Sequence, residues 1–139
     1  VIHSMVQFED GAVIAQLGIP DMKLPISYAF SYPKRLHSKA PRLDFTQYAT
    51  LTFEEPDMER FRNLAFAFDA VRKGGNMPCI LNAANEVVVA AFLHDEIGFL
   101  QMSDVIEKTM AKATFIPVPT YEDYVATDAE ARKIAEKLI

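Results

Sequence analysis

The residues best suited to chemistry near the start of the chain are His3 and Ser4. An imidazole exchanges a proton near neutral pH, so His3 could donate a proton or orient a substrate. The sequence supplies no nucleophile, base and orienting group together, so a small complete hydrolase using His3 or His94 is the least favoured function. From residue type alone, a hydrogen-bonded, half-buried histidine is the favoured interpretation of His3.

A second candidate is the loop Gly18–Met22 (GIPDM), which follows an apolar run. Loops at strand ends often carry function, and the Met22 thioether could make a soft apolar contact with a flat ring. A turn followed by a helix is the simpler explanation. In that case Asp21 caps a short helix over residues 22–32, with Pro25 in its first turn.

Three further groups have chemically capable side chains. Asn82, Asn85 and Glu86 fall at i, i+3 and i+4 of one helix face, which indicates a ligand-binding patch or, preferably, a network that cross-links helices. Residues 94–96 (HDE) do not share a helix face, so they cannot form one metal site unaided. Cys79 is the single cysteine, which excludes an intramolecular disulfide, and we expect a buried, unreactive thiol.

A β-hairpin must position the first two candidates. The apolar runs 1–8 and 12–17 are joined through Asp10-Gly11, a strong signal for a tight turn. Strict alternation along the first run places Ile2 with Ser4 on one face and His3 on the other. Apolar residues occur on both faces, so such a hairpin needs cover on both sides.

The rest of the chain predicts one more strand and then helices. Residues 48–53 (YATLTF) favour a third strand, and Pro33 ends the short helix before it. Amphipathic periodicity predicts a helix after Asp57, a nearly all-apolar central helix from about 78 to 94, and a third helix capped by Ser103. Two capping boxes, at Thr120 and Thr127, predict a short helical turn and a separate last helix.

The predicted fold class is therefore α+β: a short antiparallel β piece, a hairpin plus one strand, followed by a bundle of about four helices. The domain boundaries we expect are 1–56 for the strands plus linker and 57–139 for the bundle.

Composition excludes several function classes. The 139 residues carry a formal net charge of −5, which argues against a general nucleic-acid binder. No apolar run approaches a membrane span, and no G-x-G-x-x-G fingerprint, P-loop or metal-binding carboxylate pair is present. The chain begins without Met inside an apolar run, so we expect a piece of a longer protein.

An ordered series of short motifs carries a family resemblance. The motifs are Val1–Val6, Asp10-Gly11, Ala15–Gly18, Pro20–Met22, Pro25-Ile26, Tyr32-Pro33, Leu43–Phe45, Leu51–Phe53, Pro56-Asp57, Leu81–Glu86, Val89–Phe92, Asp128 and Ala131-Arg132. In this order they resemble the deoxyxylulose phosphate reductoisomerase family over nearly the whole chain. Ala12 departs from the pattern, because a serine is expected after the Asp-Gly turn.

The resemblance implies an enzyme with an N-terminal NADPH-binding domain, a central catalytic domain and a C-terminal helical bundle. It implies a homodimer that converts 1-deoxy-D-xylulose 5-phosphate to 2-C-methyl-D-erythritol 4-phosphate for isoprenoid biosynthesis, using NADPH and Mg²⁺ or Mn²⁺. It would lie in the bacterial cytoplasm, or in a plastid if the source is a photosynthetic eukaryote. Neither a nucleic acid nor a membrane would be a partner.

Under this resemblance, residues 1–56 are the last strands of the catalytic domain plus the linker. The acidic metal ligands and the phosphate-binding loop would precede Val1, so no metal ligand, no bound cofactor and no activity are expected of this chain alone. His3 matches a histidine that lines the active site, and Pro20 and Met22 match a loop that closes over substrate and nicotinamide. The alternative is a free-standing helical interaction or scaffold module that binds partners through its apolar strand edges.

Overall fold

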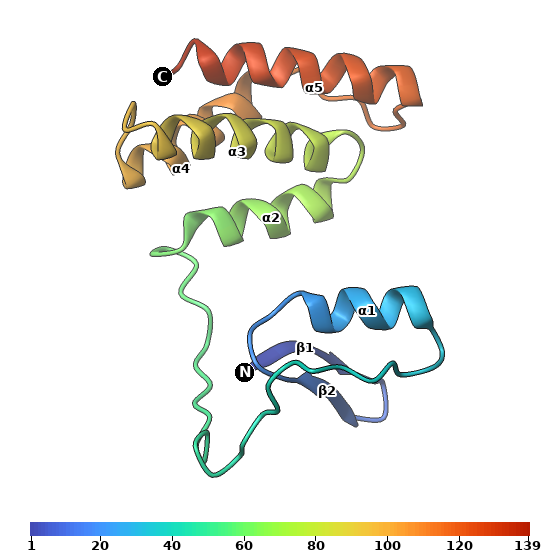
Figure 1. The fold of residues 1–139 in the computed structure, drawn as a ribbon. Coiled ribbons are helices and arrows are strands. Elements are labelled where there is room, and N and C mark those ends of the chain that lie inside the picture. Colours follow the sequence, from blue (N-terminus) through green and yellow to red (C-terminus); the bar gives the residue numbers. More distant parts are fainter. The chain divides into compact units, whose positions relative to one another are not determined.

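The computed structural model describes all 139 residues and divides into two compact units, residues 1–54 and 55–139. The first unit contains a two-stranded sheet and one helix, and the second contains four helices (Figure 1). This confirms the α+β class and the bundle of four helices. None of the helices has the length and apolar content that a membrane crossing requires.

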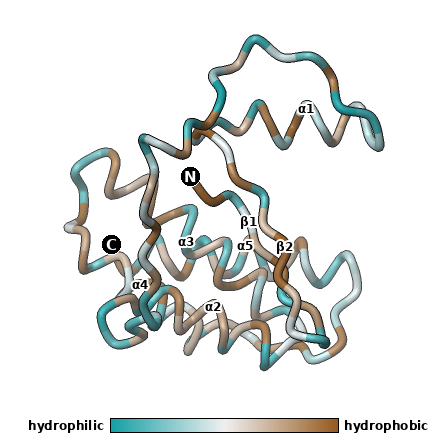
Figure 2. Tube along the Cα trace, turned by 90° about the horizontal axis from the view of Figure 1, so that it is seen from below, coloured by the Kyte–Doolittle hydropathy of each residue, from teal (hydrophilic) through white to brown (hydrophobic).

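The predicted hairpin is confirmed. Strand β1 (Ile2–Gln7) pairs antiparallel with β2 (Val13–Leu17). Gly11 adopts φ +86°, which glycine reaches without the steric cost of a Cβ atom, and the Asp10 carboxylate accepts a 2.9 Å hydrogen bond from the Ala12 N–H. Strand β2 is largely hydrophobic, whereas β1 mixes apolar and polar residues (Figure 2).

The pairing of the strands is interrupted at His3. Ile2 pairs with Leu17, but the next pair is Ser4 with Gln16, so β1 has one extra residue. Such a β-bulge shifts the alternation of side chains by one. The predicted alternation is therefore wrong at this point: Ile2 and Ser4 do not share a face, because the bulge lies between them.

The third strand expected over residues 48–53 does not form, and the sheet has two strands only. Its apolar side chains are exposed, with Phe53 at 67% and Leu51 at 41% of their full accessibility. A β-prone composition makes a strand only when a neighbour supplies hydrogen bonds and cover, and this segment has neither.

Helix α1 (Lys23–Ser31) follows β2 and is one residue shorter at each end than expected. Its N-cap position is Met22 rather than Asp21. Asp21 still supports the helix start, because its carboxylate accepts a 2.9 Å hydrogen bond from the Lys23 N–H. The peptide bond between Tyr32 and Pro33, just after the helix, is cis.

The second unit is built from α2 (Arg62–Lys73), α3 (Met77–Leu93), α4 (Phe99–Lys112) and α5 (Tyr121–Glu136). Helix α3 contacts each of the other three helices, which confirms its predicted central place (Figure 1). Alanines supply much of its buried surface and let neighbouring helices approach closely. The buried alanines of the unit are Ala70, Ala83, Ala84, Ala91, Ala113, Ala131 and Ala135.

Three predicted helix boundaries in this unit are wrong. Helix α2 begins at Arg62 rather than directly after Asp57, whose carboxylate instead accepts hydrogen bonds from the Glu59 and Arg60 N–H groups in a preceding turn. Helix α4 begins at Phe99, where the Gln101 side chain accepts a 2.7 Å hydrogen bond from the Gly98 N–H, so Ser103 lies inside the helix. Helix α5 is continuous from the capping box of Thr120 onward. Thr127 does not open a new helix, because its hydroxyl is buried and accepts a hydrogen bond from the Asn76 amide.

Asn76, immediately before α3, joins three parts of the second unit. Its amide nitrogen donates to the Thr114 carbonyl and to the Thr127 hydroxyl, both at 2.9 Å, and its amide oxygen accepts from the Ile116 N–H at 2.9 Å. The side chain is fully buried, with all these groups satisfied. The α2–α3 turn, the α4–α5 loop and the middle of α5 are thereby fixed to one another.

Candidate functional site

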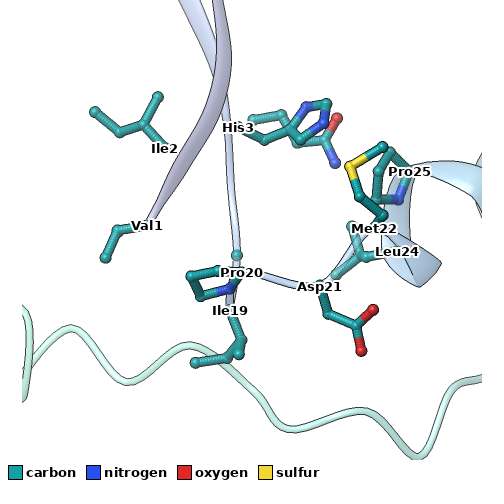
Figure 3. Close-up of a pocket in the computed structure, with 11 residues that line it drawn as sticks. Val1, Ile2, His3, Ile19, Pro20, Asp21, Met22, Leu24 and Pro25 are labelled. Atoms are coloured by element: carbon teal, nitrogen blue, oxygen red, sulfur yellow. The ribbon is translucent and has the colours of Figure 1, made fainter. Parts of the chain in front are cut away.

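The structure brings His3, Pro20 and Met22 into the lining of one cavity of about 350 Å³ in the first unit. The cavity lies between the start of β1, the end of β2, the loop that follows and the first turn of α1 (Figure 3). The three residues chosen from the sequence thus share one site, although they are separated by up to 19 positions in the chain.

The β-bulge places His3 in this lining. At a bulge, two residues of one strand oppose a single residue of the other, and the extra residue can turn a side chain toward a new direction. Here the extra residue of β1 falls between the pairs Ile2–Leu17 and Ser4–Gln16. His3 therefore stands next to Gln16, and both line the cavity. Regular pairing would have placed neighbouring residues of β1 on opposite faces.

The loop that carries Pro20 and Met22 is fixed at both ends. At its start, the Gly18 N–H donates a 2.9 Å hydrogen bond to the Val1 carbonyl, which extends the hairpin to the edge of the cavity. At its end, Asp21 accepts from the Lys23 N–H, and the Met22 carbonyl accepts from the Ile26 N–H at 3.1 Å. The Met22 side chain is 58% exposed, so a ligand can reach it.

The cavity combines apolar walls with few polar groups, as ligand pockets usually do. Figure 3 shows the Met22 side chain extending toward the His3 side of the cavity, whereas the Asp21 carboxylate points away from His3. The Met22 thioether and the proline rings suit a flat or aliphatic group of a ligand, and the His3 imidazole beside them can donate a proton to that ligand.

Gln16, the polar residue of β2 that lies next to His3 in the cavity lining, is not among the candidate residues that the sequence indicates. The signal in the sequence was a lone carboxamide at the second-last residue of an otherwise apolar strand that leads into the Gly18–Met22 loop. Gln16 is half-buried and lines the cavity opposite the bulge. Because both faces of the hairpin carry apolar residues, the sequence alone did not indicate which strand residues line the cavity.

The polar residues of α3 mainly join helices. The Asn82 amide donates to Glu86 at 3.0 Å, and Glu86 forms a 2.6 Å ion pair with Arg132 of α5, which also binds Asp128. The hydrogen bond from Arg132, and next the one from Asn82, lower the pKa of the Glu86 carboxyl. The cross-linking interpretation is confirmed for Asn82 and Glu86, but Asn85 is exposed and takes no part in this network.

The other candidates do not form a site. The partly buried Cys79 thiol lies 3.7 Å from the Tyr124 carbonyl, and burial raises its pKa, as in an unreactive thiol. His94 caps the end of α3, with Nδ1 2.8 Å from the Ala90 carbonyl. Nowhere in the chain do three or more His, Cys, Asp or Glu side chains cluster so that they could hold a metal ion.

Comparison with known families gives a match over residues 17–134 to the DXP reductoisomerase C-terminal domain. Among curated relatives, 1-deoxy-D-xylulose 5-phosphate reductoisomerase of Bacteroides thetaiotaomicron is 73% identical over 139 residues, and that of Porphyromonas gingivalis is 54% identical. Each match covers all of this chain but 36% of the relative. The chain thus spans about a third of the length of these relatives.

Solved structures agree with the sequence comparison. The reductoisomerase from Zymomonas mobilis in complex with NADPH matches 99% of this chain with a TM-score of 0.85 and 46% identity. A DOX-P reductoisomerase in complex with NADPH, fosmidomycin and magnesium matches with a TM-score of 0.84 and 35% identity. In both cases the match covers 36% of the solved chain.

Proposed function

The chain belongs to the DXP reductoisomerase C-terminal domain family, and from this premise we propose that it is the C-terminal part of a 1-deoxy-D-xylulose 5-phosphate reductoisomerase. The complete enzyme would convert 1-deoxy-D-xylulose 5-phosphate to 2-C-methyl-D-erythritol 4-phosphate in isoprenoid biosynthesis. The observation that carries the proposal is the 73% identity to a curated reductoisomerase over all 139 residues. The same full coverage favours a part of an enzyme over a free-standing interaction module.

Residues 1–56 would then be the end of the catalytic domain plus the linker, and residues 57–139 the C-terminal helical domain. The finding that supports this division is the separation of the chain into two compact units, residues 1–54 and 55–139, near this point. The helical domain would support the structure of the enzyme, because its polar groups are engaged in helix-to-helix contacts such as that of Glu86 with Arg132.

The cavity of the first unit would form part of the active site. His3 would contact the substrate or the cofactor, and Pro20 with Met22 would close over the nicotinamide and the substrate. The support is that all three line one cavity and that the exposed Met22 thioether offers an apolar contact to a flat ring. His3 would donate a hydrogen bond or hold a proton at one of its ring nitrogens.

The residues present fit the cofactors only in part. NADPH would supply the hydride for the reduction, and the apolar lining with Met22 is compatible with the nicotinamide ring. A divalent metal needs several oxygen ligands, and the acidic side chains of this chain are not clustered for that role. The ligands for Mg²⁺ or Mn²⁺ would therefore come from the part of the enzyme outside this chain. We further propose a homodimer in the bacterial cytoplasm, or in a plastid if the source is photosynthetic.

The test uses the full-length protein that contains this chain. We expect NADPH to be consumed only when deoxyxylulose phosphate and a divalent metal are both supplied. A folded full-length protein without this activity would refute the proposal. In the same assay, His3→Gln should lower kcat/KM by about 10²-fold or more if His3 acts as acid or base.

Met22→Ala should mainly raise the KM for NADPH or substrate, because it removes an apolar contact and leaves the acid–base groups in place. Met5→Ala is the matched control, since Met5 is also about half exposed but does not line the cavity. Equal kinetics for the two methionine variants would show that Met22 does not contact a ligand.

A further inference from the structure

Resting on the proposed function, we infer that Gln16 is an additional ligand-binding residue of the cavity, whose carboxamide binds a neutral hydroxyl or carboxamide group of the substrate or cofactor. Gln16 is the second-last residue of β2 and pairs with Ser4, immediately beside the bulge that carries His3. It lines the same cavity as His3, Pro20 and Met22.

The hydrogen-bonding state of Gln16 supports a ligand. A glutamine carboxamide offers two donors and one acceptor with two lone pairs. Of the three polar side chains that line the cavity, that of Asp21 accepts a hydrogen bond from the Lys23 N–H, whereas His3 and Gln16 face the cavity without such a partner. No side chain or backbone group of this chain forms a hydrogen bond with the Gln16 carboxamide, although the residue is half-buried. Its polar atoms are thus available on the wall of an otherwise mainly apolar cavity.

The chemistry of the partner follows from the carboxamide. A neutral group that both donates and accepts is best matched by another group of the same kind, such as a hydroxyl or a carboxamide. An anionic phosphate would instead call for Arg, Lys or a row of backbone N–H groups, and none of the residues lining this cavity is Arg or Lys. The two sources with suitable groups are the hydroxyls of a sugar-phosphate substrate and the carboxamide of nicotinamide.

The bulge gives a geometric reason for this role. Because β1 has one extra residue between the pairs Ile2–Leu17 and Ser4–Gln16, the pairing of the strands is locally irregular, and the side chains of His3 and Gln16 both reach the cavity. A ligand seated against Met22 would then meet an imidazole and a carboxamide from neighbouring strands. The imidazole can exchange a proton, whereas the carboxamide can only orient the ligand.

The experiment compares Gln16→Met with Gln7→Met in the full-length enzyme. Methionine keeps the length of the side chain and removes its strong hydrogen-bonding groups. Gln7 is exposed at the far end of the same hairpin, where it pairs with Val13 and lies outside the cavity. The measured quantities are the KM of deoxyxylulose phosphate, the Kd of NADPH by titration calorimetry, and Tm.

We expect Gln16→Met to raise one of the two constants by roughly 2- to 10-fold, the usual range for one lost neutral hydrogen bond, with Tm unchanged. A rise in the KM of the substrate alone indicates a substrate hydroxyl, and a rise in the Kd of NADPH alone indicates the nicotinamide carboxamide. Gln7→Met should change neither constant. Gln16→Glu, which keeps acceptor oxygens but has no N–H donor, serves as a second variant if Gln16→Met is poorly soluble.

If both Gln16 variants fold and match the wild type in both constants, Gln16 does not bind the ligand. A change in Tm with unchanged binding constants also overturns the inference, because it indicates a structural role. An inactive wild-type enzyme would be a different result: it would refute the proposed function itself, and the role of Gln16 with it.

Discussion

Replacing Asn76 by alanine should destabilise the helical unit more than any other single amide substitution in α3 or its caps. The side chain is fully buried and makes hydrogen bonds to Thr114, Ile116 and Thr127, all at 2.9 Å. Each such bond contributes about 0.5–1.5 kcal/mol net, and a buried group left without a partner costs about 1–3 kcal/mol. Because relaxation and water entry recover part of this loss, we expect a decrease of about 2–4 kcal/mol in the free energy of unfolding.

The control for this experiment is Asn82→Ala. Asn82 lies in the same helix but is exposed, and its amide makes one 3.0 Å hydrogen bond, to Glu86. Its replacement should change stability by less than about 0.5 kcal/mol, since alanine also favours helix formation. Urea unfolding followed by far-UV circular dichroism, with the m-value checked for each variant, measures both. Equal midpoints for the two variants would refute the argument that the buried junction fixes α3, the α4–α5 loop and α5 together.

Three other predictions follow from the same contacts and from the proposed function. Gly75→Ala should destabilise the chain by about 2–5 kcal/mol, because φ is +57° and an added Cβ would lie 2.3 Å from the Ile116 carbonyl oxygen; a Tm equal to that of wild type would contradict this. The hydrogen bond from Arg132 lowers the pKa of Glu86 in the folded state below its ordinary value of 4.5. The ion pair therefore contributes its full stabilisation above pH 4.5, and this stabilisation is lost as the pH falls through the lowered pKa of Glu86. Unfolding midpoints of wild type and Arg132→Gln should therefore converge as the buffer is made more acidic, and a constant difference down to full protonation would exclude this contribution. The isolated 139-residue chain should show neither reductoisomerase activity nor saturable NADPH binding in calorimetry, and a clear binding isotherm would show that this chain holds more of the cofactor site than proposed.

The sequence predicted those elements whose signals are local. Asp10-Gly11 determines the hairpin turn, and the apolar surface around α3 determines its central place in the bundle. Errors arose where a tertiary contact changes the meaning of a local signal. Thr127 looks like a helix cap, but its hydroxyl pairs with Asn76 and the helix continues through it. Residues 48–53 have a strand composition but no neighbour with which to pair.

The candidate site was predictable in a similar, partial way. Residue types alone favoured a hydrogen-bonded, half-buried His3, which is wrong, because the side chain is exposed. Only the ordered motifs connected it with Pro20 and Met22. The structure then placed the three in one cavity. Gln16 had only one signal in the sequence, a lone carboxamide in β2, because the alternation gives no sign of the bulge that brings it beside His3.

The bulge at His3 also affects how the chain tolerates changes of length. Since β1 contains one residue more than β2 between the pairs Ile2–Leu17 and Ser4–Gln16, deleting a single residue there could restore regular pairing without loss of a strand. The hairpin would survive, but the imidazole would no longer stand beside Gln16. In a library of single-residue deletions in the full-length protein, this short stretch would therefore separate folding from the role proposed for the cavity: the variants should accumulate normally but lose the proposed activity.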